Sequence, residues 1–152
     1  NSCSSAMRSF ERALDAAMAM ASTQGTGTVV IRRSHHIACL EAYLKRATDR
    51  GMMALVYSSD PVAASVAPFG AVSPVFTPNP LAAGIPTSGD PILIDVSASY
   101  TTNSLTTRLH NAGGRLPHAW VQDARGTPTD TVGSKPPVVV RGSNWFCIST
   151  PS

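Results

Sequence analysis

Apolar spacing in the first 57 residues constrains the fold more than any other feature of this chain. Helical spacing over residues 5–21 is followed by a β-branched run at 28–31, a second helical stretch at 37–50 and an apolar run at 52–57. This order predicts two parallel strands, near 28–32 and 52–57, joined by a right-handed crossover. A third strand is expected at 91–96, so the sequence favours an α/β protein with a mixed, largely parallel sheet.

Length and composition favour an ordinary soluble protein. With 152 residues, 43% hydrophobic and 14% charged, the chain can bury a core, and we expect residues 1–152 to form a single domain. The net charge is +3, and the basic residues are scattered, which argues against a nucleic-acid partner. No apolar run is long enough to span a bilayer and no signal-peptide pattern occurs, so we expect a cytoplasmic protein without a membrane partner.

The cysteines do not suggest a structural site. Cys3, Cys39 and Cys147 are odd in number and far apart, and no C-x-x-C motif occurs, so neither a disulfide framework nor a zinc site is predicted. Cys39 falls on the expected apolar face of the second helix, where it would be a small core residue. Because His110 and His118 have no carboxylate cluster nearby, no metal is expected.

The turn Ser34-His35-His36 is the first candidate for chemistry. It lies between an expected strand and an expected helix, where the carboxyl ends of parallel strands open onto a crevice. Histidine titrates nearest to neutrality, so it can give or take a proton. At a helix entrance, the positive end of the helix dipole would favour a neutral imidazole on His36. The alternative is that both histidines are solvated turn residues.

Three further polar segments allow either a functional or a structural interpretation. Asp95 ends the third expected strand, so its carboxylate could bind ribose or amide groups, or could cap the segment after it. The polar run at 97–103 could present hydroxyls and N–H groups to phosphate, or could form a plain turn. Residues 58–60 follow the second strand at the usual ligand position, although Ser and Asp are common turn formers. No G-x-G-x-x-G follows any strand, so an ordinary Rossmann dinucleotide site is not predicted.

Taken in order, several short segments resemble the malate/L-lactate dehydrogenase family, which includes ureidoglycolate and sulfolactate dehydrogenases and piperideine-2-carboxylate reductases. The resemblance covers roughly residues 6–132 and includes a Ser-x-His motif at 34–36 and an Asn-Pro motif at 79–80. The matching segments are 25–36, 50–57, 66–70, 79–82, 91–97, 116–120 and 123–130.

This resemblance implies an NAD(P)-dependent oxidoreductase that transfers a hydride between a nicotinamide cofactor and a 2-hydroxy or 2-oxo acid, or a cyclic imino acid. It also implies a three-layer α/β arrangement that is not a Rossmann fold. The family's proton-transferring histidine falls on His36, and a residue near the active site falls on Asn79. The cofactor contacts fall on Ser58, Ser59, Asp60, Asp95, Val96 and Ser97.

The chain also departs from the family pattern. His35 stands where the family has Asn or Gly, and Ala38 stands where it has Gly. Pro78 replaces the Thr of Thr-Asn-Pro, which removes a hydroxyl and a backbone donor. The family's N-terminal Ser-His-Gly segment and its Lys-Gly-Tyr-Gly segment have no counterpart. We therefore expect a fragment that corresponds to the nucleotide-binding domain, with an unaligned tail at 133–152.

Two functions from different classes remain open at this point. One is the dehydrogenase, with NAD or NADP as cofactor and an undetermined substrate. The other is a non-catalytic, truncated remnant that acts only as a scaffold or interaction module, which the missing segments and Pro78 favour. Because family members are dimers and the tail at 138–148 is apolar, a homo-oligomer is expected.

Overall fold

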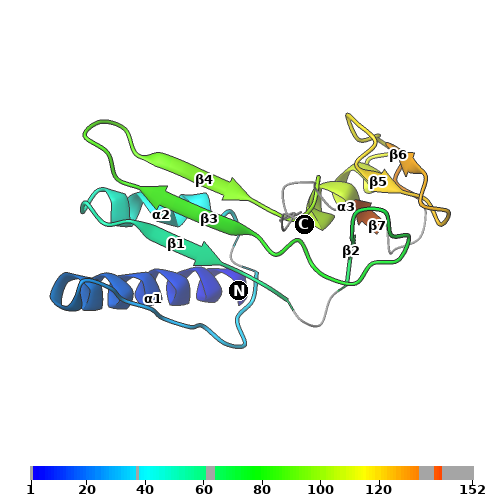
Figure 1. The fold of residues 1–152 in the computed structure, drawn as a ribbon. Helices are drawn as coiled ribbons and strands as arrows, with labels where there is room; N and C mark the ends of the chain where they lie inside the picture. Colours follow the sequence, from blue (N-terminus) through cyan, green and yellow to red (C-terminus); the bar gives the residue numbers. More distant parts are fainter. Residues whose placement is uncertain (1, 37, 61–63, 134–138, 142–152) are drawn as a thin grey trace, which may run out of the picture. The chain divides into compact units, whose positions relative to one another are not determined.

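The structure is a computed structural model that describes residues 2–36, 38–60, 64–133 and 139–141. The chain forms two compact units (Figure 1): unit 1 contains Asn1–Tyr57 and Leu81–Asp95, and unit 2 contains Ser58–Pro80 and Val96–Ser152. The helices are α1 (Ser2–Gln24), α2 (Glu41–Thr48) and α3 (Asn103–Asn111). The strands are β1 (Ala54–Tyr57), β2 (Val66–Ala67), β3 (Leu81–Ile85), β4 (Ile92–Val96), β5 (Val121–Gln122), β6 (Pro128–Thr129) and β7 (Val139–Arg141).

Unit 1 is built on a three-stranded sheet in the order β1-β3-β4. β1 and β3 are antiparallel, with Leu55 opposite Ala83 and Tyr57 opposite Leu81. Figure 1 shows β4 running back beside β3 after a short loop. β3 and β4 are therefore joined by a hairpin-like connection and not by a crossover.

One face of this sheet is covered by α1 and α2. Side chains alternate along β1, so Ala54 and Val56 are buried in the core whereas their neighbours are exposed. Gly84 allows α2 to lie close to β3, because a Cβ at this position would be only 3.0 Å from Leu44 Cβ and Thr48 Cγ2. The buried core consists of Met18, Leu40, Leu44, Ala47, Ala54, Val56 and Ala82.

The opposite face of the sheet exposes apolar side chains. Leu55 and Tyr57 of β1 are 53% and 67% exposed, and Ile92 and Ile94 of β4 are 53% and 39% exposed. Leu93 lies between the two isoleucines and packs on the core, which puts Ile92 and Ile94 on the outer face. We call Leu55, Tyr57, Ile92 and Ile94 the outer apolar face.

Unit 2 contains a four-stranded sheet in the order β2-β7-β5-β6. β2 and β7 are parallel, whereas β5 is antiparallel to both β6 and β7. The helix α3 begins after Thr102, whose Oγ1 accepts the Leu105 N–H at 3.2 Å, as expected of an N-cap residue. Leu116, Val121 and Val132 form the buried core of this unit, and Leu105, Leu109 and Trp120 pack against it.

The prediction of a largely parallel sheet is wrong, because the pairing of β1 with β3 is antiparallel and the sheets are small. Residues 28–31 belong to none of the strands of the described residues, and Val30 is 74% exposed. β-branched residues favour extended backbone, but a strand also requires a neighbour that supplies hydrogen bonds. Without a strand at 28–31, the predicted crossover to the strand at 52–57 does not form. The two small sheets also do not support the prediction that the fold differs from a Rossmann fold.

The other predicted elements form with changed boundaries. The expected strands at 52–57 and 91–96 correspond to β1 and β4. The expected helix at 5–21 corresponds to α1, which is longer at both ends. The helix expected at 37–50 begins only at Glu41 and ends at Thr48. Within the described part of the chain, no helix combines the length and apolarity needed to cross a membrane.

Candidate functional site

His36 lies in an exposed loop and not at the first turn of α2. The N-cap position of α2 is Leu40, so His36 is outside the first turn, where the helix dipole acts. The imidazole instead accepts a hydrogen bond at Nδ1 from the Ala38 backbone N–H, with an N···N distance of 3.2 Å. In a neutral imidazole that accepts at Nδ1, the ring proton is on Nε2. The loop therefore holds His36 with Nε2 as its donor.

The backbone on both sides of His36 is strained. Arg33 has φ of 55° and Ala38 has φ of 61°, a left-handed conformation that non-glycine residues rarely adopt. Such residues cost free energy and persist only where surrounding structure maintains them. Their presence on both sides of one histidine distinguishes this loop from an ordinary solvated turn.

The Asp95 carboxylate holds the other end of the same loop. Its Oδ2 accepts the Glu41 backbone N–H at 3.0 Å and the Cys39 thiol at 3.4 Å. Asp95 therefore caps α2, which precedes it in the sequence, and not the segment after it. The prediction that Cys39 is a buried core residue is wrong, because Cys39 is exposed in the loop before the helix begins.

A second group of polar side chains gathers in unit 2. Asn79 Oδ1 accepts hydrogen bonds from Ser59 Oγ and Thr77 Oγ1, both at 2.8 Å. The Asp60 backbone N–H approaches Thr77 Oγ1 at 3.5 Å. We call Ser59, Asp60, Thr77 and Asn79 the polar cluster. Because Asn79 Oδ1 is occupied, its Nδ2 is the group suited to donate to an oxygen of a bound molecule.

Backbone contacts bring a third segment to the polar cluster. The Ser58 N–H donates to Pro80 O at 3.1 Å, and the Ala98 N–H donates to Pro78 O at 2.7 Å. Residues 58–60, 77–80 and 97–98, which are far apart in the sequence, therefore lie side by side. Val96 is exposed, and Ser97 Oγ donates to Ser99 O at 3.1 Å.

Thr77 was not predicted from the sequence. Substitution of the family Thr by Pro78 removes a hydroxyl at that position, but the preceding Thr77 is buried and directs its hydroxyl to Asn79. The prolines at 78 and 80 favour an extended backbone, but Asn79 has φ of 42°, so the contact depends on a left-handed residue that the sequence did not signal.

The predicted site residues are thus divided between the units. His36 and Asp95 belong to unit 1, where both contact the loop that leads into α2. Within unit 2, the structure brings Ser59, Asp60 and Asn79 together. The unit 2 residues among those predicted are Ser58, Ser59, Asp60, Asn79, Val96 and Ser97.

The carboxylates with a shifted pKa lie outside these groups. A side-chain hydrogen bond from Arg46 lowers the pKa of Asp15, and backbone hydrogen bonds from Thr127 and Arg125 lower the pKa of Asp123.

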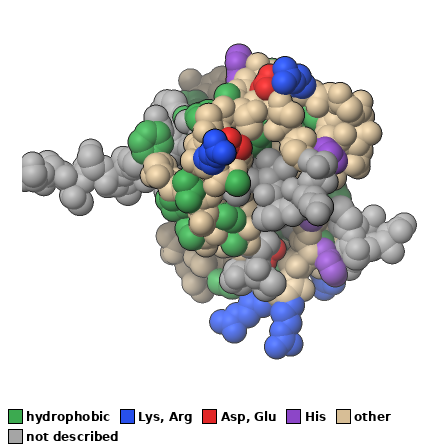
Figure 2. Space-filling view, turned by 90° about the vertical axis from the view of Figure 1, so that its right-hand side faces the viewer, with side chains coloured by type: hydrophobic (Ala, Val, Ile, Leu, Met, Phe, Trp, Pro, Cys, Tyr) green, Lys and Arg blue, Asp and Glu red, His purple; other side chains and the backbone are tan. Residues whose placement is uncertain are grey.

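Lys and Arg side chains are dispersed over the face shown in Figure 2. Among the described residues, no three His, Cys, Asp or Glu side chains are grouped to share a metal ion.

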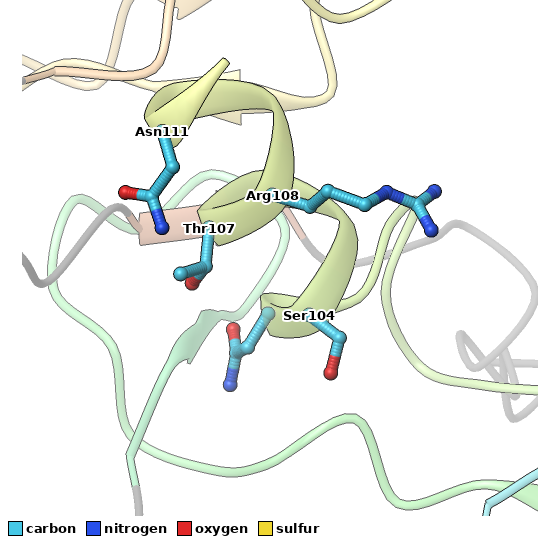
Figure 3. A pocket seen from close by; sticks show the side chains of 5 residues that line it. Ser104, Thr107, Arg108 and Asn111 are labelled. Atoms are coloured by element: carbon cyan, nitrogen blue, oxygen red, sulfur yellow. The ribbon is translucent and has the colours of Figure 1, made fainter.

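An open hollow of about 520 Å³ lies along α3. It is lined by Asn103, Ser104, Thr107, Arg108 and Asn111. Figure 3 shows that Arg108 extends away from Thr107 and Asn111, so these side chains do not converge on one point. The hollow therefore lacks the convergent polar groups of a binding site.

Comparison with known proteins identifies the family. The sequence profile of the family described as malate/L-lactate dehydrogenase matches residues 4–134. The chain belongs to this family. The (2R)-3-sulfolactate dehydrogenase (NADP(+)) of Chromohalobacter salexigens is 31% identical over 139 residues, which are 91% of this chain and 40% of that protein.

One further relative and one solved structure are also similar to this chain. The Δ1-pyrroline-2-carboxylate/Δ1-piperideine-2-carboxylate reductase of Pseudomonas aeruginosa is 31% identical over 121 residues, covering 79% of this chain and 36% of that protein. The solved structure of a putative malate/lactate dehydrogenase from E. coli superposes with a TM-score of 0.74 at 22% identity, which supports the fold. It covers 86% of this chain and 38% of that one. The chain spans about two fifths of the length of these relatives.

Proposed function

We propose that this chain is the nucleotide-binding part of an NAD(P)-dependent oxidoreductase that acts on a 2-hydroxy or 2-oxo acid. The observation that carries the proposal is the convergence of residues 58–60, 77–80 and 97–98, which include cofactor and substrate positions implied by the family resemblance. The name of the sulfolactate dehydrogenase relative supports NADP as one of the two cofactors considered.

The chemistry of these segments fits a nucleotide. Serine hydroxyls, a carboxylate and backbone N–H groups are suited to ribose and phosphate oxygens. The Thr101 side chain is only 6% exposed, and its Oγ1 has no hydrogen-bond partner in the described part of the chain. A buried polar atom without a partner is costly, so a bound molecule that supplied one would be favoured. Thr101 follows Ser97 in the same polar run.

His36 is assigned the proton transfer that accompanies the hydride. When bound, the nicotinamide supplies or accepts the hydride at C2 of the substrate. His36 gives a proton to the C2 oxygen during reduction and takes it back during oxidation. Asn79 positions the substrate by donating from Nδ2 to one of its oxygen atoms. The Asp95 carboxylate holds the loop that carries His36, and we also assign Asp95 as a residue that contacts the cofactor.

The proposal is tested by titrating NADH and NADPH into the chain and following fluorescence. We expect saturable binding of at least one cofactor, with Ser59→Ala and Asp60→Asn weakening it. Ser88→Ala is the matched control, because Ser88 is exposed in the loop between β3 and β4. Thr77→Val removes the hydroxyl that donates to Asn79 Oδ1 while changing the side-chain volume little. It therefore tests whether the orientation of the Asn79 amide matters for binding. Absence of binding to both cofactors by a folded sample would contradict the proposal and favour the scaffold alternative.

Self-association is a separate part of the proposal. The chain is expected to form a homo-oligomer, and the outer apolar face provides exposed apolar surface that association with a second copy would bury. Most of the apolar tail at 138–148 lies outside the described residues. Light scattering at high micromolar concentration should show a mass above that of one chain, and Leu55→Ser with Tyr57→Ser should reduce it. A monomer under these conditions would contradict this part.

A further inference from the structure

We infer that Ala38 is a positioning residue that selects the tautomer of His36. The inference rests on the proposed role of His36 in proton transfer and concerns a residue that contacts no reacting atom. Its basis is the 3.2 Å hydrogen bond from the Ala38 N–H to His36 Nδ1, made from a left-handed backbone with φ of 61°.

The direction of this hydrogen bond determines where the ring proton lies. A backbone N–H can only donate, so Nδ1 must present a lone pair to it. The neutral ring then carries its proton on Nε2. Both alternatives, the Nδ1–H tautomer and the imidazolium, would put a second donor opposite the Ala38 N–H and break the bond. Ala38 therefore favours the Nε2–H tautomer of the neutral ring over the Nδ1–H tautomer.

This preference has a consequence for the two directions of the proposed reaction. The Nε2–H group can donate a hydrogen bond to the carbonyl oxygen of a 2-oxo acid and so orient and polarise it. If the Nε2 proton moves to the C2 oxygen during reduction, Nδ1 must take up a proton from solvent, which breaks the hydrogen bond from the Ala38 N–H. To act as a base at Nε2 on a hydroxy acid, the ring must first move its proton to Nδ1. That change also costs the Ala38 hydrogen bond, so proton transfer at Nε2 requires this bond to break in both directions of the reaction.

The left-handed backbone of Ala38 is what directs its N–H at the imidazole. Alanine adopts this conformation at a cost, because its Cβ approaches the carbonyl oxygen, whereas glycine adopts it readily. A β-branched residue tolerates it least. Ala38→Gly should therefore keep the hydrogen bond and relieve strain, whereas Ala38→Val should move the backbone and remove the N–H from Nδ1.

The tautomer can be measured directly by long-range ¹H–¹⁵N correlation spectra of the histidine side chains at about pH 8, where imidazole is mostly neutral. The His36 signals are assigned from their loss in His36→Asn, and His35 in the same loop is the internal reference. We expect an unprotonated Nδ1 and a protonated Nε2 for His36. Ala38→Gly should retain this pattern with a higher melting temperature, and Ala38→Val should shift His36 towards mixed tautomers while the His35 signals stay unchanged.

Two results would overturn the inference: a protonated Nδ1 on His36 in the unchanged chain, or the same His36 pattern in Ala38→Val. If Ala38→Val fails to fold, the comparison of His36 with His35 in the unchanged chain decides the question. His36, and not His35, accepts the Ala38 N–H, so the excess of the Nε2–H form must be larger for His36. The spectra need neither cofactor nor substrate. If neither cofactor binds but His36 shows the Nε2–H tautomer, the proposed function is contradicted and this inference is not.

Discussion

Asp95 Oδ2 lies 3.0 Å from the Glu41 backbone nitrogen, so a residue at the end of a strand caps a helix that begins 54 residues earlier. The residue at the N-cap position itself, Leu40, makes no side-chain capping hydrogen bond. The carboxylate satisfies one of the N–H groups that a helix start leaves without a partner, and its negative charge faces the positive end of the helix dipole. It thereby ties β4 to the loop that carries His36.

Removal of this cap should destabilise unit 1. Asp95→Ala should lower the free energy of unfolding by about 0.5–2 kcal/mol, the usual cost of losing an N-cap acceptor. Asp95→Asn keeps an acceptor oxygen and should recover most of the loss. Urea unfolding monitored by circular dichroism measures both. Equal stability of Asp95→Ala and the unchanged chain would show that the contact contributes nothing.

The same comparison separates the two roles given to Asp95. A loss of cofactor affinity in Asp95→Ala alone has a structural explanation, because the His36 loop is disturbed as well. If the carboxylate also contacts ribose, Asp95→Asn should weaken cofactor binding while its unfolding free energy stays near that of the unchanged chain.

The elements that could be predicted from the sequence are those set by local patterns. β1, β4 and the centre of α2 follow from the spacing of apolar residues, which depends only on near neighbours. The β-branched run at 28–31 shows the limit of such patterns. Its residues favour a strand, but whether a strand forms depends on a pairing partner elsewhere in the chain. The antiparallel order β1-β3-β4 depends on the same long-range choice.

The candidate site was also only partly predictable from the sequence. The positions of His36, Ser59 and Asn79 came from family motifs, and Ser59 and Asn79 lie in one cluster. The capping role of Asp95 has no sequence signal, because its partner Glu41 is distant along the chain. Ala38 was also not predicted, since its contact with His36 depends on a left-handed φ that alanine seldom adopts.

Close packing of α2 on β3 should depend on Gly84. A Cβ at this position would press on Leu44 Cβ and Thr48 Cγ2 at 3.0 Å, tighter than most observed contacts. Gly84→Ala should therefore destabilise the chain by about 1–3 kcal/mol, the range for overpacked cores. Gly89→Ala is the control, because a Cβ there meets nothing within 4 Å. Thermal unfolding of the two variants should differ clearly, and equal melting temperatures would contradict the packing described for unit 1.

The Asp15–Arg46 ion pair should contribute stability in a pH-dependent way. Both Asp15 carboxylate oxygens accept hydrogen bonds from the Arg46 guanidinium, at 2.8 and 2.7 Å, which lowers the pKa of Asp15 in the folded chain. A lowered folded pKa means that the contribution is fully present above the unfolded value of about 3.9 and is lost as pH falls through the folded value. Asp15→Asn should thus reduce stability at pH 7 and have little effect near pH 2.

Unfolding by urea at a series of pH values tests this expectation. Arg46→Gln should reproduce the loss at pH 7, and added salt should diminish it, because the pair is exposed. If the difference in unfolding free energy between Asp15→Asn and the unchanged chain did not vary with pH, the ionised carboxylate would not be responsible for it.

The most direct test of the central claim is deuteride transfer to a 2-oxo acid by the native polypeptide that carries this chain. With cofactor deuterated at C4 of the nicotinamide, the account predicts deuterium at C2 of the hydroxy-acid product. His36→Asn should slow this transfer by about 10²–10⁴-fold, the usual worth of positioned proton transfer, and leave cofactor affinity nearly unchanged. His35→Asn should remain close to the unchanged enzyme. Transfer by His36→Asn at the unchanged rate would contradict the account.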